Sequence, residues 1–240
     1  MATRDRFAIR TKRALRHLAP QHIIKARASN RTIQKFVDKA GLVYFGNVDP
    51  NDEGRRLVRG HTVSATADDD NYSVGTIRGY DVMVITRNDI VRGRPGQKEK
   101  RCHWLICTAD LHTTSTVPHL YVGNASHEVE FLASYERLRK LRIGHYGPYS
   151  ARFMSDYSVY GLPTDGLIIE QVITPQIADV MSAHFMGASV EIEDGTVYLY
   201  IENKYPTADV LEKMLSNCLW LAQTIDDGFT VACTVPEAIN

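Results

Sequence analysis

The stretch VEIEDGTVYLYIE, residues 190–202, constrains the fold more than any other part of the chain. Apolar and polar residues alternate on both sides of Asp194-Gly195, and this dipeptide is typical of the type I′ turn of a two-residue β-hairpin. The register set by such a turn pairs Glu193 with Thr196 and Val190 with Leu199. We therefore predict an antiparallel hairpin here.

The predicted register sorts the hairpin into two faces, because successive side chains of a strand point to opposite sides. The apolar face consists of Val190, Ile192, Val197, Leu199 and Ile201. The polar face consists of Glu191, Glu193, Tyr198 and Tyr200. Since carboxylates are seldom buried, we expect the polar face to be solvated, and we predict no metal site and no acid–base pair among its carboxylates.

The sequence before residue 148 predicts an antiparallel β-meander with helices at its ends. Strands are expected over 74–77 and 80–86 around Arg78-Gly79, and then over 103–108 and 119–122. A basic helix over 4–18 ends at Pro20, a second helix runs from Asn30 as N-cap to Gly41 as C′ residue, and Ser126 caps a third helix that continues to Ile143.

The sequence after residue 148 predicts a strand, strand, helix, hairpin and helix. The strands lie over 157–161 and 167–173, and the first helix has Thr174 as N-cap, Pro175 as its first residue and its end at Gly187. Thr207 caps the last helix. Its inner stripe consists of Leu211, Leu215, Cys218, Ala222 and Ile225.

These elements indicate an α+β protein with mostly antiparallel strands rather than a βαβ alternation. Residues 1–28 form a basic amphipathic arm, 29–147 a helix with the β-meander and a further helix, and 148–240 an α+β unit. The two larger units can also form one compact domain, which a chain with 44% hydrophobic residues is well able to fill.

The charge of the chain is unevenly placed. Residues 1–40 hold 11 basic and 2 acidic side chains, whereas the remaining 200 hold 17 basic and 26 acidic ones. The arm residues expected to bind an anionic partner are Arg6, Arg10, Lys12, Arg13, Arg16, Lys25 and Arg27. A nucleic acid, an anionic membrane surface and an acidic protein surface all fit such an arm, and a protein partner is the leading choice. A homo-oligomer is left open.

Cofactors and compartment are constrained mainly by what the sequence does not contain. It has no phosphate-binding loop, dinucleotide fingerprint or hydrolase elbow, so we expect no cofactor. Cys102 and Cys107 are five residues apart on one strand and point to opposite faces, which argues against a shared metal ion. With no apolar leader, a cytoplasmic protein with reduced cysteines is expected, and peripheral attachment to a membrane stays an alternative.

Three polar residues near the end of the meander carry the enzymatic alternative. Asp110 and His112 are two residues apart, and His119 follows seven residues later. A general base would fit these residue types if they converged in a cleft. Asp68, Asp69 and Asp70 are expected to lie on an acidic surface loop, because the other ligands of a calcium loop are missing.

Trp220 lies opposite the inner stripe of the last helix. Together with Tyr198 and Tyr200 it is expected to form a partner surface, since Trp and Tyr dominate interface hot spots. A second packing layer that buries Trp220 is the alternative.

Several segments resemble a family of uncharacterised proteins from ultra-small, host-dependent candidate-phylum bacteria. They are NRTIQKFVDKAGLVYFGNV, RLVRGHTV and YSVGTIRGYDVMVITR, and the pattern from FMSDYSVYGLP through VITPQIADVM to LAQTID is similar to a wider set of bacterial proteins. The resemblance covers residues 29–228. It implies a bacterial cytoplasmic setting and no particular activity.

The leading functional hypothesis is a non-enzymatic cytoplasmic binding or adaptor protein, attached to an anionic partner by its arm. The alternative is a hydrolase-like enzyme that uses Asp110, His112 and His119. The first requires an exposed partner surface, and the second requires these three side chains to meet.

Overall fold

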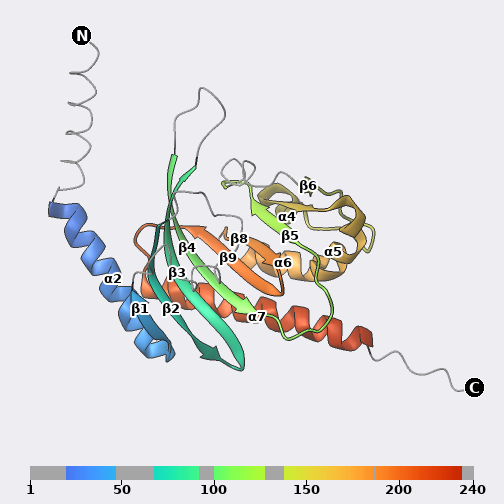
Figure 1. Ribbon diagram of the computed structural model, residues 1–240. Helices are drawn as coiled ribbons and strands as arrows, with labels where there is room; N and C mark the ends of the chain where they lie inside the picture. The colour runs from blue at the N-terminus through green and yellow to red at the C-terminus, as the bar shows by residue number, and fades with distance from the viewer. Residues whose placement is uncertain (1–19, 47–67, 92–99, 128–137, 186, 234–240) are drawn as a thin grey trace, which may run out of the picture.

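The computed structural model describes residues 20–46, 68–91, 100–127, 138–185 and 187–233 (Figure 1). The chain is an α+β protein with one large antiparallel sheet, as expected. The strands are β1 (Val43–Gly46), β2 (Asp68–Ile77), β3 (Tyr80–Val91), β4 (Lys100–Asp110), β5 (Leu120–Asn124), β6 (Arg139–Lys140), β7 (Tyr157–Gly161), β8 (Ser189–Glu193) and β9 (Thr196–Glu202). The helices are α2 (Pro20–Ala40), α4 (Ala151–Asp156), the 3-10 helix η2 (Pro163–Asp165), α5 (Gly166–Val172), α6 (Pro175–His184) and α7 (Ala208–Cys233).

The sheet has nine strands in the order β1-β2-β3-β4-β9-β8-β5-β7-β6. β2, β3 and β4 are neighbours, as the predicted meander requires, but β5 does not lie beside β4. The hairpin β8–β9 fills the space between them, with β9 paired to β4 and β8 paired to β5. Three strand spacings amount to about 14 Å, which the connection over 111–119 spans easily. Strands from both sides of residue 148 thus share one sheet.

Both predicted hairpins are confirmed. The central residues of each turn have positive φ, at 53° and 87° for Arg78 and Gly79 and at 49° and 75° for Asp194 and Gly195. Positive φ at both positions is what a type I′ turn requires. In the second hairpin Glu193 pairs with Thr196 and the register continues to Val190 with Leu199.

The helices place their buried apolar side chains against one face of the sheet, which we call the helix-covered face. α7 runs along β4 and β9 and also contacts α2 (Figure 1). The predicted inner stripe of α7 is confirmed, since Leu211, Leu215, Cys218, Ala222 and Ile225 are all buried. The strand residues of this face include Val84, Leu105, Cys107, Val190, Ile192, Val197 and Leu199.

The opposite face is also buried, which we did not expect. We call it the tyrosine face, and its cluster consists of Ile85, Cys102, Trp104, Ile106, Tyr121, Leu138, Tyr160, Tyr198 and Tyr200. The prediction of a solvated hairpin face is therefore wrong for Glu191, Tyr198 and Tyr200. β8 and β9 lie in the middle of the sheet, and large side chains of the neighbouring strands surround their polar residues.

The end of one predicted helix and the starts of two others are confirmed, but the start at Asn30 is wrong. Gly41 has φ 74°, and the backbone N–H groups of Gly41 and Leu42 donate to Asp38 and Val37, which is a Schellman motif. The same helix begins at Pro20 rather than at Asn30, because residues 21–29 contain no Gly or Pro that would interrupt it. The Thr174 and Thr207 side chains accept hydrogen bonds from the first turns of α6 and α7, as predicted.

Two predicted elements differ from the structure. The segment expected to be a strand over 167–173 is mostly the helix α5, in which Ile169 and Val172 are buried at helical spacing. Its isoleucines favoured a strand, but η2, begun by Pro163, leads into a helix instead. Ser126 lies in a turn and Arg139–Lys140 is a strand, so the helix predicted through Ile143 is wrong at both ends, while 128–137 lies outside the described residues.

The predicted arm lies largely outside the described part of the chain. This holds for residues 1–19 and hence for Arg6, Arg10, Lys12, Arg13 and Arg16, whereas Lys25 and Arg27 belong to α2. Among the described helices, none combines the length and the apolar character needed to cross a membrane.

Candidate functional site

A histidine and two glutamates meet on the tyrosine face, and we call them the His119 cluster. Glu191 and Glu193 are two residues apart on β8 and therefore share a face. His119 immediately precedes β5, which pairs with β8. Its Nε2 lies 2.8 Å from Glu191 Oε1, and its Nδ1 lies 3.9 Å from Glu193 Oε1. Glu191 has no exposed surface, whereas the side chains of His119 and Glu193 are 23% and 20% exposed, so the cluster has a buried base and opens to solvent.

The electrostatics of the cluster favour a charged imidazole. Burial lowers the pKa of His119, but the hydrogen bond and the charge of Glu191, together with Glu193 and Asp194, outweigh burial and raise the pKa above its ordinary value. The two glutamates therefore favour the protonated form of His119.

Tyr200 anchors the buried glutamate from the neighbouring strand. Its hydroxyl donates a 2.8 Å hydrogen bond to Glu191 Oε2, and its ring stacks on Tyr198 with centroids 6.1 Å apart. Burial raises the pKa of Tyr200 well above its ordinary value and that of Tyr198 to about 12. Both phenols stay protonated at neutral pH, so Tyr200 remains a donor to Glu191.

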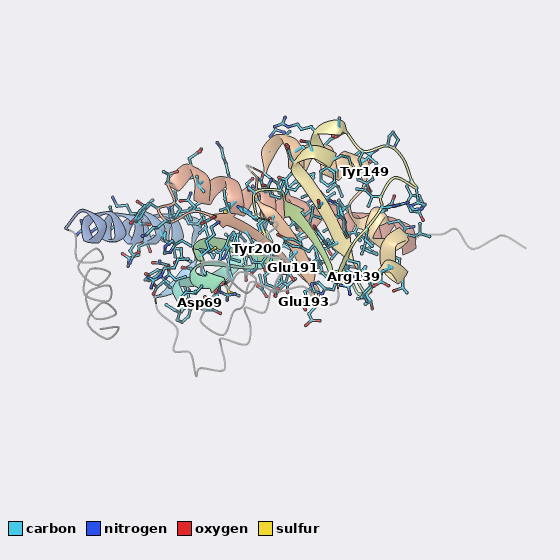
Figure 2. All side chains as sticks on the ribbon, turned by 90° about the horizontal axis from the view of Figure 1, so that it is seen from above. Asp69, Arg139, Tyr149, Glu191, Glu193 and Tyr200 are labelled. Carbon is cyan, nitrogen blue, oxygen red and sulfur yellow. The ribbon has the colours of Figure 1, made fainter. Side chains whose placement is uncertain are left out.

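A buried ion pair lies farther along the same face. The carboxylate of Asp69 accepts hydrogen bonds of 2.6 and 2.8 Å from Arg87 Nε and Nη2. Burial lowers the pKa of Arg87, but Asp69 outweighs this effect and raises it. Asp69 belongs to β2 and is buried, so the prediction of an acidic surface loop over Asp68–Asp70 is wrong. Figure 2 shows Asp69, Tyr200, Glu191 and Glu193 on one side of the sheet and Tyr149 on the other.

The exposed end of this face is hollowed into a groove of about 400 Å³. One part of its lining is apolar, with Tyr72, Val74 and Met83. Another part is polar, with Asp81, Thr108, Asp110 and Thr196. Thr196 pairs with Glu193 across the hairpin turn, so the groove borders the His119 cluster.

The three residues of the enzymatic alternative have different partners. Asp110 accepts a hydrogen bond from Thr196, His112 stacks on Tyr80 with centroids 4.3 Å apart, and His119 pairs with Glu191. The backbone N–H groups of His112 and Thr113 donate to Asp226 of α7, which fixes this connection to the helix. The convergence that a hydrolase would require is not found among these three.

The cysteines lie as predicted. Cys102 belongs to the tyrosine face and Cys107 to the helix-covered face, so the two point to opposite sides of the sheet. Cys218 is buried in α7 with its thiol 3.6 Å from the Cys107 carbonyl oxygen. These three cysteines are not part of a disulfide.

The expected surface of Tyr198, Tyr200 and Trp220 does not form. The two tyrosines are buried in the tyrosine face. Trp220 lies on the helix-covered side, half-buried, with its ring edge-on to Phe185 at 6.0 Å. The expected exposure is thus wrong for both tyrosines. Trp220 packs against the helix-covered core but keeps part of its surface exposed, so the burial of the alternative is found only in part.

An exposed aliphatic surface lies at the β6 end of the sheet instead. Leu162, Leu167 and Ile168 are 41%, 53% and 44% exposed. Leu162 lies between β7 and η2, and the other two belong to α5. The side chains of Leu141 and Ile169 both approach Gly161, and Arg139 pairs with Gly161, so β6 and the residues after it lie next to α5. The exposed basic residues of this region are Arg139, Lys140 and Arg142, and Asp165 is a half-buried acidic member. We call this surface the aliphatic corner.

The loop behind the aliphatic corner is held by Glu170 of α5. This buried carboxylate accepts hydrogen bonds from the backbone N–H groups of Gly144 and His145 at 2.9 and 2.8 Å and lies 2.7 Å from His145 Nδ1. Burial raises the pKa of Glu170, but these partners outweigh it and lower the pKa below its ordinary value. Glu170 therefore has a structural part in shaping the corner.

Neither the His119 cluster nor the aliphatic corner was predicted from the sequence. The His119 cluster joins segments 72 residues apart, and the alternation of β8 indicated only a solvated face. Leu167 and Ile168 could have been found from the helical spacing of Ile169 and Val172, which leaves them on the outer side.

Comparisons with known proteins show a likeness in fold. No protein-family model matches the chain. A search of curated proteins gives no match. Among solved structures, the chain is similar to the mycobacterial trehalose monomycolate transport factor A, TtfA, with a TM-score of 0.57 and 15% sequence identity over 88% of this chain and 99% of that one. At this identity the likeness concerns the fold alone.

Proposed function

We propose that the protein is a non-enzymatic binding protein that attaches to an anionic membrane surface through the aliphatic corner. The observation that carries this proposal is the exposure of Leu162, Leu167 and Ile168 beside the basic residues of β6. Large aliphatic side chains that are exposed together mark interaction sites for proteins or membranes.

The chemistry around the aliphatic side chains favours a lipid surface. Leucine and isoleucine gain free energy by entering the acyl boundary, while arginine and lysine beside them attract anionic headgroups. Arg139 and Arg142 provide this charge, and Asp165 opposes it only in part. Lys140 pairs with Tyr160 and therefore points to the tyrosine face. Aliphatic and basic side chains thus act on the same partner.

The N-terminal residues add charge of the same sign. Residues 1–40 hold 11 basic and 2 acidic side chains, so this end of the chain is also attracted to anionic lipid. A single weak anchor gives reversible attachment, and two together give stable attachment.

The fold likeness is compatible with a binding role. The structural neighbour is named a trehalose monomycolate transport factor, and that name describes transport rather than a reaction. The separate partners of Asp110, His112 and His119 point the same way, since the enzymatic alternative has no assembled site.

Sedimentation with vesicles tests the aliphatic part of the proposal. The full chain is mixed with phosphatidylglycerol-containing vesicles and with neutral phosphatidylcholine vesicles. We expect binding to the anionic vesicles and a loss of roughly 10- to 100-fold in affinity for Leu167→Ser with Ile168→Ser. A fully buried side chain contributes about 1.5–3 kcal/mol, and about half of each of these two side chains is exposed and can be inserted. The matched control is Val43→Ser with Phe45→Ser, which removes two exposed apolar side chains from the opposite edge of the sheet.

A second pair of variants tests the charged part. Arg139→Glu with Arg142→Glu should weaken binding, and the wild-type affinity should fall as salt is added. Lys204→Glu with Lys213→Glu makes the same change of formal charge far along the chain and should have little effect. Equal binding by all variants, or binding of duplex DNA or RNA in place of vesicles, would contradict the proposal. If the corner variants still bound vesicles but lost a contact with another protein, the partner of the corner would be a protein instead.

A further inference from the structure

The geometry of the His119 cluster supports an inference that does not depend on membrane attachment. One ligand atom from each of His119, Glu191 and Glu193 lies within 4.8 Å of the others. Zn²⁺ holds nitrogen and oxygen ligands at about 2.0–2.2 Å, so two ligands of one ion lie roughly 3–3.5 Å apart. Small side-chain rotations bring the three atoms to that spacing.

The cluster also has the supporting contacts of a metal site. Tyr200 donates to Glu191 Oε2 and so directs Oε1 toward His119. Such outer partners orient ligands and are a regular part of metal centres. Glu191 and Glu193 stand on a strand whose register is fixed by the turn at Asp194-Gly195, so their carboxylates are held on a rigid element.

Access and charge are suitable as well. Glu191 is fully buried at the base, and the partly exposed side chains of His119 and Glu193 leave a path from solvent. Asp110 lines the adjacent groove and adds negative charge near its entrance. An imidazole nitrogen with two carboxylate oxygens suits a divalent ion of the Zn²⁺ or Mn²⁺ type, and water completes the coordination.

We propose that His119, Glu191 and Glu193 bind one divalent transition-metal ion, which joins β8 to the start of β5. The direct contact of His119 Nε2 with Glu191 Oε1 is then replaced by two bonds to the same ion. The ion has a structural or regulatory part, because it would tie the hairpin of β8 and β9 to a segment 72 residues away in the chain.

Isothermal titration calorimetry of the full chain with Zn²⁺ tests the proposal. We expect one ion per chain at this site. His119→Gln and Glu193→Gln should each weaken binding by more than the 10- to 100-fold that loss of an outer partner costs, and Tyr200→Phe should fall within that range. The matched control is Glu202→Gln, which removes a carboxylate of β9 that lies 3.2 Å from Lys100 and should leave stoichiometry and affinity nearly unchanged.

Co²⁺ provides a second readout that separates this site from the thiols. The complex should show weak visible bands of a nitrogen and oxygen environment that disappear in Glu193→Gln. A strong thiolate-to-cobalt charge-transfer band would place the ion on a cysteine and overturn the proposal. Unchanged Zn²⁺ binding in both ligand variants, or no binding by the wild-type chain, would show that the cluster is an ion pair only.

Discussion

The helix-covered face and the tyrosine face are both buried, yet they are filled with different kinds of side chain. Leu199 and Tyr200 are neighbours on β9 and show the contrast directly. Leu199 points into an apolar cluster that needs only close packing, whereas Tyr200 donates to a buried glutamate. The first kind of burial tolerates any well-packed apolar side chain. The second depends on each polar group keeping its particular partner.

The buried ion pair of the tyrosine face gives the largest expected effect. Arg87→Met should lower the free energy of unfolding by about 3–5 kcal/mol, because it removes both hydrogen bonds that Arg87 donates to the buried Asp69. Urea unfolding measures the change. The double variant Arg87→Met with Asp69→Leu should recover most of the loss.

An exposed ion pair is the matched control for this prediction. Lys39 and Glu212 lie 2.7 Å apart at the surface, and Lys39→Met should cost less than about 1 kcal/mol. If Arg87→Met cost no more than Lys39→Met, the tyrosine face would not depend on its ion pair, and the contrast between the faces would be lost.

The next effect concerns the hydrogen bond that anchors Glu191. Tyr200→Phe keeps the ring but removes the donor to a buried carboxylate, so we expect a loss of about 1.5–3 kcal/mol. Tyr146→Phe removes an exposed hydroxyl and should be close to neutral. Combined with Glu191→Gln, Tyr200→Phe should cost less than the sum of the two single changes, since both break the same bond. Additive costs would mean that the bond contributes little.

The contrast between the two faces also explains which parts of the fold could be predicted from the sequence. The register of β8–β9, the Schellman end at Gly41 and the stripe of α7 follow from local rules, and all are confirmed. The buried state of Glu191 does not follow from local rules, because it depends on where β8 and β9 lie in the sheet. Only the insertion of this hairpin between β4 and β5 surrounds its polar residues with large side chains.

The candidate site was less predictable than the fold for the same reason. His119 was singled out from the sequence, but with Asp110 and His112, which are its neighbours in the chain. Its partner in space is Glu191, which comes from a strand that the sequence places far away. Sequence proximity indicates shared function only when the residues stay on one element, and His119 lies beyond the connection that leaves β4.

The contribution of Glu170 to stability should depend on pH, whereas that of the apolar packing around it should not. The pKa of Glu170 is lower in the folded protein than in the unfolded chain, so its contribution is present above the unfolded pKa and is lost as the pH falls through the folded pKa. Near neutral pH, Glu170→Gln should cost about 1–2 kcal/mol. Urea midpoints of wild type and variant should converge in acid, and a difference that does not depend on pH would contradict this explanation.

The smallest effect concerns the turn that keeps the two faces in register. Gly195 has φ 75° with open space around it, so Gly195→Ala adds backbone strain of about 1 kcal/mol and no collision. Gly166→Ala is the control, since Gly166 begins α5 with φ −52° and also has open space, and alanine there should be neutral or slightly stabilising. A register shift of one residue would move Glu191 to the helix-covered face, which the packing of both faces opposes. We therefore expect Gly195→Ala to lower the urea midpoint while the strand register stays the same. A Gly195→Ala protein whose near-ultraviolet circular dichroism lost the tyrosine signal would show that the turn residue, and not the two faces, maintains the register.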